Sequence, residues 1–373
     1  MSGMTLTKTG DTTDTDDKTD TNAVVLAAGD VVIYLSDSDL SSAAEGGNGL
    51  FAYDGGILYL YGIEFSSTEN SSRGVYTVDG GYAIIYDINI KTTGAHCAAL
   101  ANDTGGGYIH AANATLSTAG QGSPLIYSTG TIEVVNASGE GTQIVGMEGL
   151  NYVKISNSDL SSTLSTATND PVANAVILYQ STSGDSSEGT ADMQVCNSTL
   201  KAPNLSTGSF FYITNTDATI TLEKTTVTFD TDKCYLIYSA GNSSSAGWGS
   251  SGSNGGNTEV TFIEETIEGG LYCDNISTLT LYVTDNSTWT GYTTYDSDAY
   301  TSSASGTGIT IALDSTSEWI VNGNSTVLNL YAASGSKIVD EAGNTVTIKS
   351  STKTVSGTSD YTIHRNGNVF RYR

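Results

Sequence analysis

Basic residues are scarce in this chain. Its 373 residues include 14 Lys and Arg against 40 Asp and Glu, which gives a formal net charge of −26 at pH 7. A surface of this sign repels nucleic-acid phosphates and anionic lipid head groups. We therefore expect no nucleic-acid partner, and we expect an exported protein whose acidic, hydroxyl-rich surface keeps it soluble.

Long hydrophobic runs are absent too. No apolar stretch approaches the roughly 20 residues that span a bilayer, so we expect no membrane insertion. The N-terminal segment also lacks the basic start and apolar run of a signal peptide. The predicted location is extracellular or at a cell surface, and an exported chain of this sequence would have lost its leader.

Cysteine and proline are also rare, with four and three residues respectively. The four cysteines form no CxxC pair of the kind found in zinc and redox sites, and they are Cys97, Cys196, Cys234 and Cys273. We expect free thiols buried in strands. Only three Pro residues occur, so few positions are closed to a β-ladder.

The apolar residues that are present favour strands over disorder. Only 38% of the residues are hydrophobic, but they are mostly β-branched or aromatic and include 22 Tyr. They alternate with polar residues in short runs such as ILYLYGIEF (57–65) and TLTLYVT (278–284). Such alternation is typical of half-buried strands, so the sequence predicts an all-β chain.

A period of 25 residues organises the N-terminal part. The segments LFAYDGG, VYTVDGG, LANDTGG and LIYSTGT begin at Leu50, Val75, Leu100 and Leu125, and glycines follow at 55, 80, 105 and 130. A second series contains Leu40, Phe65, Ile90 and, one residue late, Leu116. A repeat of this length predicts a parallel β-helix, or β-solenoid, with like residues stacked in ladders.

Leu50, Val75, Leu100 and Leu125 are expected to form one inward ladder. The recurring glycines mark a corner that needs positive φ or a close backbone approach, with Asp54 and Asp79 as turn formers. Tyr34 and Tyr59 are expected to be equivalent as well.

Beyond residue 130 the period loosens. Ile144 and Val145 take the ladder position, and the next turn carries an insertion over about 161–172. Residues 191–195 and 218–222 are expected to be equivalent, as are 210–213 and 235–238 at a spacing of 25. The Gly/Ser-rich segment 239–257 is predicted to leave the solenoid as a loop.

We divide the chain into an acidic leader or linker (1–22), the β-helix (23–350) and a C-terminal cap or tail (351–373). About 25 residues per coil gives roughly thirteen coils and a rod of ~60 Å. Asp14, Asp16 and Asp17 in the leader resemble a weak calcium-binding cluster. They lack the spaced glycine and final Glu of an EF-hand, so we assign no metal site and expect no cofactor.

Five segments together resemble right-handed parallel β-helix proteins of the pectin-lyase-like type, in particular adhesin-like microbial surface proteins. They are GSPLIYSTGTI (122–132), ILYQSTSGD (177–185), GWGSSGSNGGN (247–257), LTLYVTDNSTWTG (279–291) and LDSTSEWIVNGNS (313–325). The resemblance implies a secreted or surface-displayed β-helix without an assigned catalytic centre, and it supplies no functional residues.

The sequence does not support a catalytic centre. A polysaccharide lyase needs a Lys or Arg base, and basic residues are thinly scattered. A hydrolase needs opposed carboxylates, whereas Asp54 and Asp79 recur beside a corner Gly and fit turns. His96, His110 and His364 occupy unrelated positions, and His96 and Cys97, as adjacent strand residues, are expected to face opposite sides. We therefore predict that the protein is not an enzyme.

Tryptophan gives the one candidate binding residue. Trp289 and Trp319 lie in strand-like runs and are expected in the core, whereas Trp248 lies in the Gly/Ser loop, where it could stack on a sugar. The leading hypothesis is a structural or adhesive β-helix that binds surface glycans or itself, with filament formation as a variant. A carbohydrate-binding or polysaccharide-degrading protein is the alternative, and a Thr-rich ice-binding protein is a remote one.

Overall fold

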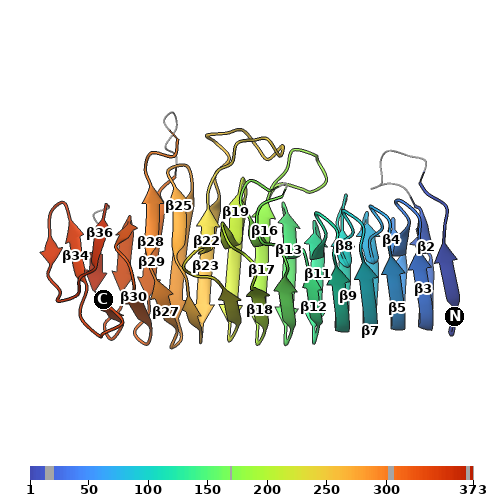
Figure 1. Cartoon of the computed structure of the whole chain (residues 1–373), viewed down its shortest axis with the longest axis horizontal. Coiled ribbons are helices and arrows are strands. Elements are labelled where there is room, and N and C mark those ends of the chain that lie inside the picture. Colours follow the sequence, from blue (N-terminus) through green and yellow to red (C-terminus); the bar gives the residue numbers. More distant parts are fainter. Residues whose placement is uncertain (13–20, 169, 301–305, 367–369, 373) are drawn as a thin grey trace.

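The computed structural model describes residues 1–12, 21–168, 170–300, 306–366 and 370–372. Within these ranges the chain forms strands and turns and no helix, so no helix could cross a membrane. The strands stack side by side along an elongated body and follow the chain order over most of its length (Figure 1). Near the C-terminal end the order changes, because residues 362–365 pair with both 325–327 and 347–350. The calcium-like cluster Asp14, Asp16 and Asp17 lies outside the described residues.

One sheet, here called sheet B, contains eleven parallel strands, one from each successive turn of the chain. They are β2 (Ala23–Ala28), β4 (Asn48–Tyr53), β6 (Val75–Val78), β8 (Leu100–Asn102), β10 (Pro124–Ser128), β13 (Gln143–Glu148), β16 (Asn174–Tyr179), β19 (Ser209–Thr214), β22 (Tyr235–Ser239), β25 (Leu271–Asp274) and β28 (Thr293–Asp296).

The second sheet, sheet A, is parallel throughout. Its strands are β1 (Thr5–Lys8), β3 (Val32–Ser42), β5 (Ile57–Ser67), β7 (Gly81–Thr92), β9 (Gly107–Thr118), β11 (Thr131–Val135), β12 (Ser138–Gly141), β14 (Asn151–Ser156), β15 (Asp159–Ser162), β17 (Thr190–Cys196), β18 (Thr199–Ala202), β20 (Asp217–Glu223), β21 (Thr226–Phe229), β23 (Asn257–Ile263), β26 (Thr278–Thr284), β29 (Gly308–Leu313), β32 (Asn329–Ala332) and β37 (Phe370–Tyr372).

Two small sheets complete the C-terminal part. Sheet C contains β24 (Thr266–Glu268), β27 (Thr288–Gly291), β30 (Glu318–Val321) and β33 (Lys337–Val339). Sheet D contains β31 (Ser325–Val327), β36 (Thr362–Arg365), β34 (Thr347–Ser350) and β35 (Thr354–Val355). In sheet D, β35 pairs antiparallel with β34, so the parallel stacking is interrupted there.

The stacked parallel sheets confirm the predicted all-β, β-solenoid architecture. Leu50 pairs with Val75, and Val75 pairs with Leu100, as the 25-residue period predicts. The fourth member of this ladder is Ile126, however, because β10 is displaced by one residue and the expected Leu125 lies beside it. Both side chains are fully buried, so apolarity alone could not distinguish them.

Beyond residue 130, the observed residue pairs agree with the predicted ones to within one residue. The ladder continues from Ile126 to Val145 and on to Val176, and Ala191 faces Ala218 as expected. The expected spacing of 25 between 210–213 and 235–238 is wrong by one residue, because Phe211 pairs with Ile237.

The interior is one continuous apolar core that extends from Val25 to Ile363. Trp289 and Trp319 stack in it at a centroid distance of 4.8 Å, and each indole N–H donates to a backbone carbonyl, so their predicted core role is confirmed. All four cysteines are free thiols, but only Cys196 and Cys273 lie in strands.

A bend in sheet A occurs at one residue per turn that adopts positive φ. Asp87 (φ 57°), Asn113 (φ 57°), Asn136 (φ 55°) and Asn157 (φ 51°) occupy this position in successive turns. Asn and Asp tolerate the left-handed region better than most residues, which explains their recurrence. At the opposite corner, Asp54 and Asp79 also have positive φ, as turn formers do.

The recurring glycines have two roles. Gly55, Gly80 and Gly105 have φ between 72° and 78°, whereas a Cβ on Gly130 would lie 2.5 Å from the carbonyl oxygen of Gly107. The segment expected to be a polar leader contains β1, which extends sheet A by pairing with β3.

Candidate functional site

A groove of about 440 Å³ lies on the outer face of sheet B. Its floor comes from successive strands: Tyr127 on β10, Gly146 on β13 and Ile177 on β16 are paired in register. Since neighbouring residues of a strand point to opposite faces, these side chains face outward where Ile126, Val145 and Val176 face the core. The groove therefore follows the long axis of the solenoid.

Two insertions make one wall of the groove. The loop after β16 contributes Ser181, Ser183 and Asp185, and the Gly/Ser loop after β22 contributes Trp248. Thr182 connects the two loops, because its backbone N–H and its hydroxyl both donate to the carbonyl of Gly247, at 3.0 and 2.8 Å.

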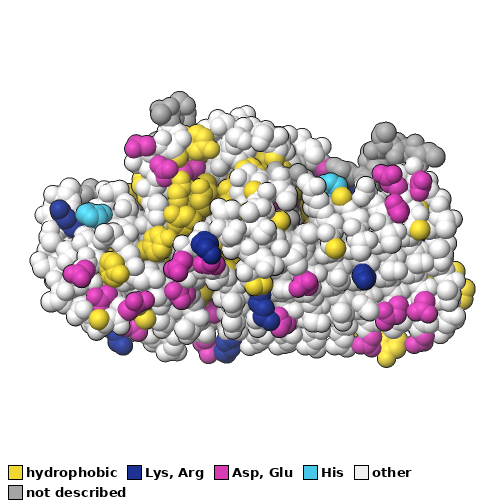
Figure 2. Space-filling model, viewed as in Figure 1, with side chains coloured by type: hydrophobic (Ala, Val, Ile, Leu, Met, Phe, Trp, Pro, Cys, Tyr) yellow, Lys and Arg dark blue, Asp and Glu magenta, His cyan; other side chains and the backbone are white. Residues whose placement is uncertain are grey.

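In Figure 2, hydrophobic side chains gather in the upper middle of the molecule, and acidic side chains outnumber basic ones on the visible face.

Trp248 packs against Tyr179 of β16, with the ring centroids 4.4 Å apart and the planes inclined at 39°. The tryptophan is held from behind, since its carbonyl accepts hydrogen bonds from the buried side chains of Asn242 and Asn254. Gly247 and Gly249, both with positive φ, flank it. A half-exposed aromatic ring is thus fixed on the groove wall by its own loop.

Glu148 organises hydroxyl groups below this aromatic pair. Its carboxylate accepts hydrogen bonds from the hydroxyls of Tyr127 (2.7 Å), Tyr179 (2.9 Å), Ser183 (3.4 Å) and Ser181. Burial, and after it the negative charge of Glu148, raises the pKa of Tyr179 well above its usual value, so this hydroxyl stays protonated and donates. Glu148 itself is only 2% exposed.

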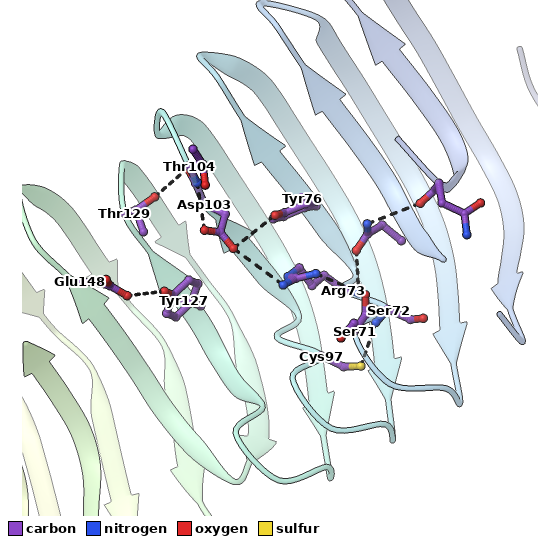
Figure 3. Close-up of polar contacts among 12 residues, drawn as sticks. Ser71, Ser72, Arg73, Tyr76, Cys97, Asp103, Thr104, Tyr127, Thr129 and Glu148 are labelled. Atoms are coloured by element: carbon purple, nitrogen blue, oxygen red, sulfur yellow. Dashed lines mark hydrogen bonds and ion pairs between the residues drawn. The ribbon is translucent and has the colours of Figure 1, made fainter. Parts of the chain in front are cut away.

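Arg73 and Asp103 lie at the end of the groove nearer the N-terminus. The guanidinium is 3.8 Å from the Asp103 carboxylate and 4.6 Å from the centre of the Tyr76 ring, and the Tyr76 hydroxyl donates to the same carboxylate at 3.3 Å. Figure 3 shows these three side chains directed toward one another from neighbouring turns, with Tyr127 and Glu148 on the turns that follow.

Asp170 lines the groove beside two amide side chains, those of Gln143 and Asn174. Burial raises the pKa of Asp170, although hydrogen bonds from Asn174 (2.8 Å) and Gln143 (2.7 Å) oppose the shift. Asp170 and Gln143 both line the groove and present oxygen and nitrogen atoms that a polyhydroxyl ligand could bond.

Of the residues that line this groove, the sequence indicates Trp248 alone as a binding residue. Trp248 lies on the groove wall, and His96 lines its other end, but Asp54 and Asp79 do not line it. His110 lies 3.5 Å from Glu133 on sheet A. Tyr127 and Tyr179 could have been noticed as outward residues of sheet-B strands, whereas nothing in the sequence places Trp248 against Tyr179.

No protein-family model matches this chain, and no curated protein or solved structure is significantly similar to it. Among the described residues, no group of three or more His, Cys, Asp or Glu side chains is arranged to hold a metal ion.

Proposed function

We propose that this chain is an extracellular, non-catalytic β-solenoid that acts as an adhesin by binding glycans in the sheet-B groove. In this proposal the solenoid is right-handed and pectin-lyase-like, with roughly thirteen coils. The observation that carries the proposal is the Trp248–Tyr179 pair above the hydroxyls held by Glu148.

This combination suits a sugar ligand. A pyranose presents apolar C–H faces and a rim of hydroxyls, so a site for it needs aromatic surface next to fixed polar groups. Trp248 and Tyr179 supply the aromatic surface, while Gln143, Asp170 and Ser181 supply polar atoms. Because the groove extends over successive strands, a glycan chain would lie parallel to the solenoid axis.

The hydrogen bonding of Glu148 supports binding over turnover. A catalytic carboxylate has to approach the reacting atoms of its substrate. Glu148 is instead buried and surrounded by hydroxyl donors from the protein, so it positions Tyr127 and Tyr179. End-to-end assembly gains no support from sheet D, where β35 interrupts the parallel stack.

The test combines a glycan array with calorimetry on two variants. Trp248→Ala removes the half-exposed ring and should weaken binding about tenfold. Gly146→Phe places a ring on the groove floor, at a position where an added Cβ has its nearest neighbour at 3.4 Å. This variant should abolish binding. Tyr282→Ala and Thr261→Phe, on the outer face of sheet A, are the matched controls and should bind as the wild type does.

Two results would contradict the proposal. Failure to retain any glycan on the array would remove the binding function. Release of reducing or unsaturated sugar ends from a polysaccharide by the wild type, but not by Gly146→Phe, would replace an adhesin with an enzyme acting in the same groove.

A further inference from the structure

The charged residues that line the groove indicate which glycans it accepts. Four carboxylates line it, those of Asp103, Glu148, Asp170 and Asp185, and Arg73 is the one Arg or Lys among the described lining residues. We infer that the groove selects uncharged glycans and rejects those carrying carboxylate groups, such as polyuronates. This inference rests on the proposed glycan-binding function.

Arg73 is not positioned to recognise an anionic sugar. A uronate-binding site needs a cation whose charge is directed at the ligand. The Arg73 guanidinium is instead paired with Asp103, lies over the Tyr76 ring and donates to the carbonyl of Ser71 at 3.3 Å. Only 8% of the residue is exposed. Its charge is therefore compensated within the protein.

Two of the remaining carboxylates lie where the ligand would bind: Asp170 is beside Gln143, and Asp185 is on the loop that carries Ser181. Glu148 is buried beneath the Tyr127 and Tyr179 hydroxyls that donate to it, so its negative charge acts on the groove from below. Apart from Arg73, Asp103 and His96, the lining Arg, Lys, His, Asp and Glu residues are all acidic. A uronate would bring another negative charge into this partly desolvated space, where repulsion exceeds that in bulk water.

An uncharged sugar meets no such penalty. Its hydroxyls can donate to the oxygens of Asp170 and Gln143 and accept from the serine hydroxyls of the 181–185 loop. The apolar floor at Ile177 and Pro124, and the hollow left by Gly146, fit the C–H face of a sugar ring. The acidic surface of the whole chain, with its net charge of −26, favours the same discrimination.

Calorimetry on matched oligosaccharides tests the inference. Uncharged gluco-, manno- and xylo-oligosaccharides are compared with oligogalacturonates of equal length, in roughly 0.05 M and 0.5 M salt. The wild type should bind at least one uncharged ligand about tenfold or more tightly than the uronate at low salt, and added salt should narrow the difference.

Two double variants separate the groove from the overall charge. Asp170→Asn with Asp185→Asn removes two groove charges but keeps side chains of similar size and hydrogen-bonding capacity. It should raise the ratio of uronate affinity to uncharged-ligand affinity about tenfold, because the repulsion acts on the uronate alone. Asp232→Asn with Glu268→Gln removes two charges that line a different cavity and should leave the preference as in the wild type.

The outcomes distinguish the two proposals. If no oligosaccharide binds, the glycan-binding function itself is wrong. If the oligogalacturonate binds the wild type as tightly as the best uncharged ligand, glycan binding stands and the charge selection is overturned. Equal effects of the two double variants would also overturn it, because the groove carboxylates would then have no special role.

Discussion

The turns before residue 130 and those after it differ in how they form the bend of sheet A. In the earlier turns, strands of eleven or twelve residues, β3, β5, β7 and β9, continue through the bend. Ile63, Ile88 and Ala114 follow the bend residue and are buried. The backbone ladder thus continues through the bend, with a buried apolar residue behind it in β5, β7 and β9.

In the later turns the strands are broken at the bend, and side chains replace part of the ladder. The N–H of Ala137 donates to the hydroxyl of Ser158, and the N–H of Ser158 donates to the hydroxyl of Ser198. Farther on, the N–H of Thr225 donates to Glu265. This substitution satisfies buried N–H groups while allowing turns of unequal length.

The contrast teaches where a solenoid of this kind can carry function. Insertions are accommodated in the turns whose corners no longer depend on a continuous ladder, and those insertions form the wall of the groove. The regular turns supply its other end, with Arg73 and Asp103. The regular turns therefore provide mainly the scaffold, and the insertions of the later turns provide most of the binding surface. Both lie over one continuous core.

The largest expected effect is on stability and belongs to the regular turns. Leu100→Ala removes a fully buried ladder residue and should lower the free energy of unfolding by about 3 kcal/mol, because a cavity remains. Urea unfolding followed by circular dichroism measures this loss. Trp248→Ala should lower it by less than about 1 kcal/mol. Equal losses would contradict the division into scaffold and binding surface.

The stability of the protein is expected to depend on pH through Glu265, which lies at the sheet-A bend of one of the turns after residue 130. Burial raises the pKa of Glu265 from 4.5 to about 7, so the folded state disfavours its charged form. The contribution of Glu265 to stability is intact below about pH 4.5 and is lost as the pH rises through about 7, at a cost on the order of 2 kcal/mol.

Glu265→Gln tests this effect, because Gln keeps an acceptor for the Thr225 N–H and does not ionise. The urea midpoints of the variant and the wild type should diverge between pH 4.5 and 8, with the wild type becoming the less stable. Glu264→Gln, the adjacent half-exposed residue, is the control and should behave as the wild type. Parallel pH profiles for Glu265→Gln and the wild type would show that Glu265 does not titrate in this range.

The smallest expected effect concerns the bend residue itself. Asn157 has φ of 51° and an exposed side chain, so Asn157→Val should cost about 1–2 kcal/mol, mainly through backbone strain. Asn157→Gly should be nearly neutral, because glycine adopts this φ freely. Thermal unfolding of both variants measures the difference. A Val variant as stable as the Gly variant would show that the bend does not impose this conformation.

Much of the fold could be predicted because, in a stacked repeat, residues separated by one period lie next to each other in adjacent strands. Leu40, Phe65, Ile90 and Leu116 pair as their spacing predicts. The prediction that Leu125 belongs to the inward ladder was wrong by one residue, because Ile126 pairs with Leu100. Leu125 and Ile126 are both apolar and buried, so the sequence does not show which of them pairs with Leu100. The bend could have been found from the Asn and Asp at positions 87, 113, 136 and 157.

The sequence by itself determined the period, and through it the parallel stack and the inward ladder. The strand-like runs around Trp289 and Trp319 determined that these two side chains lie in the core. It also determined that Trp248 lies on a loop. Only the tertiary structure decided that this loop returns to Tyr179 and that Arg73 and Glu148 share the same groove. The physical reason is that a ladder is set by equal spacing, whereas the groove depends on how two insertions of unequal length fold back onto the outer face of sheet B.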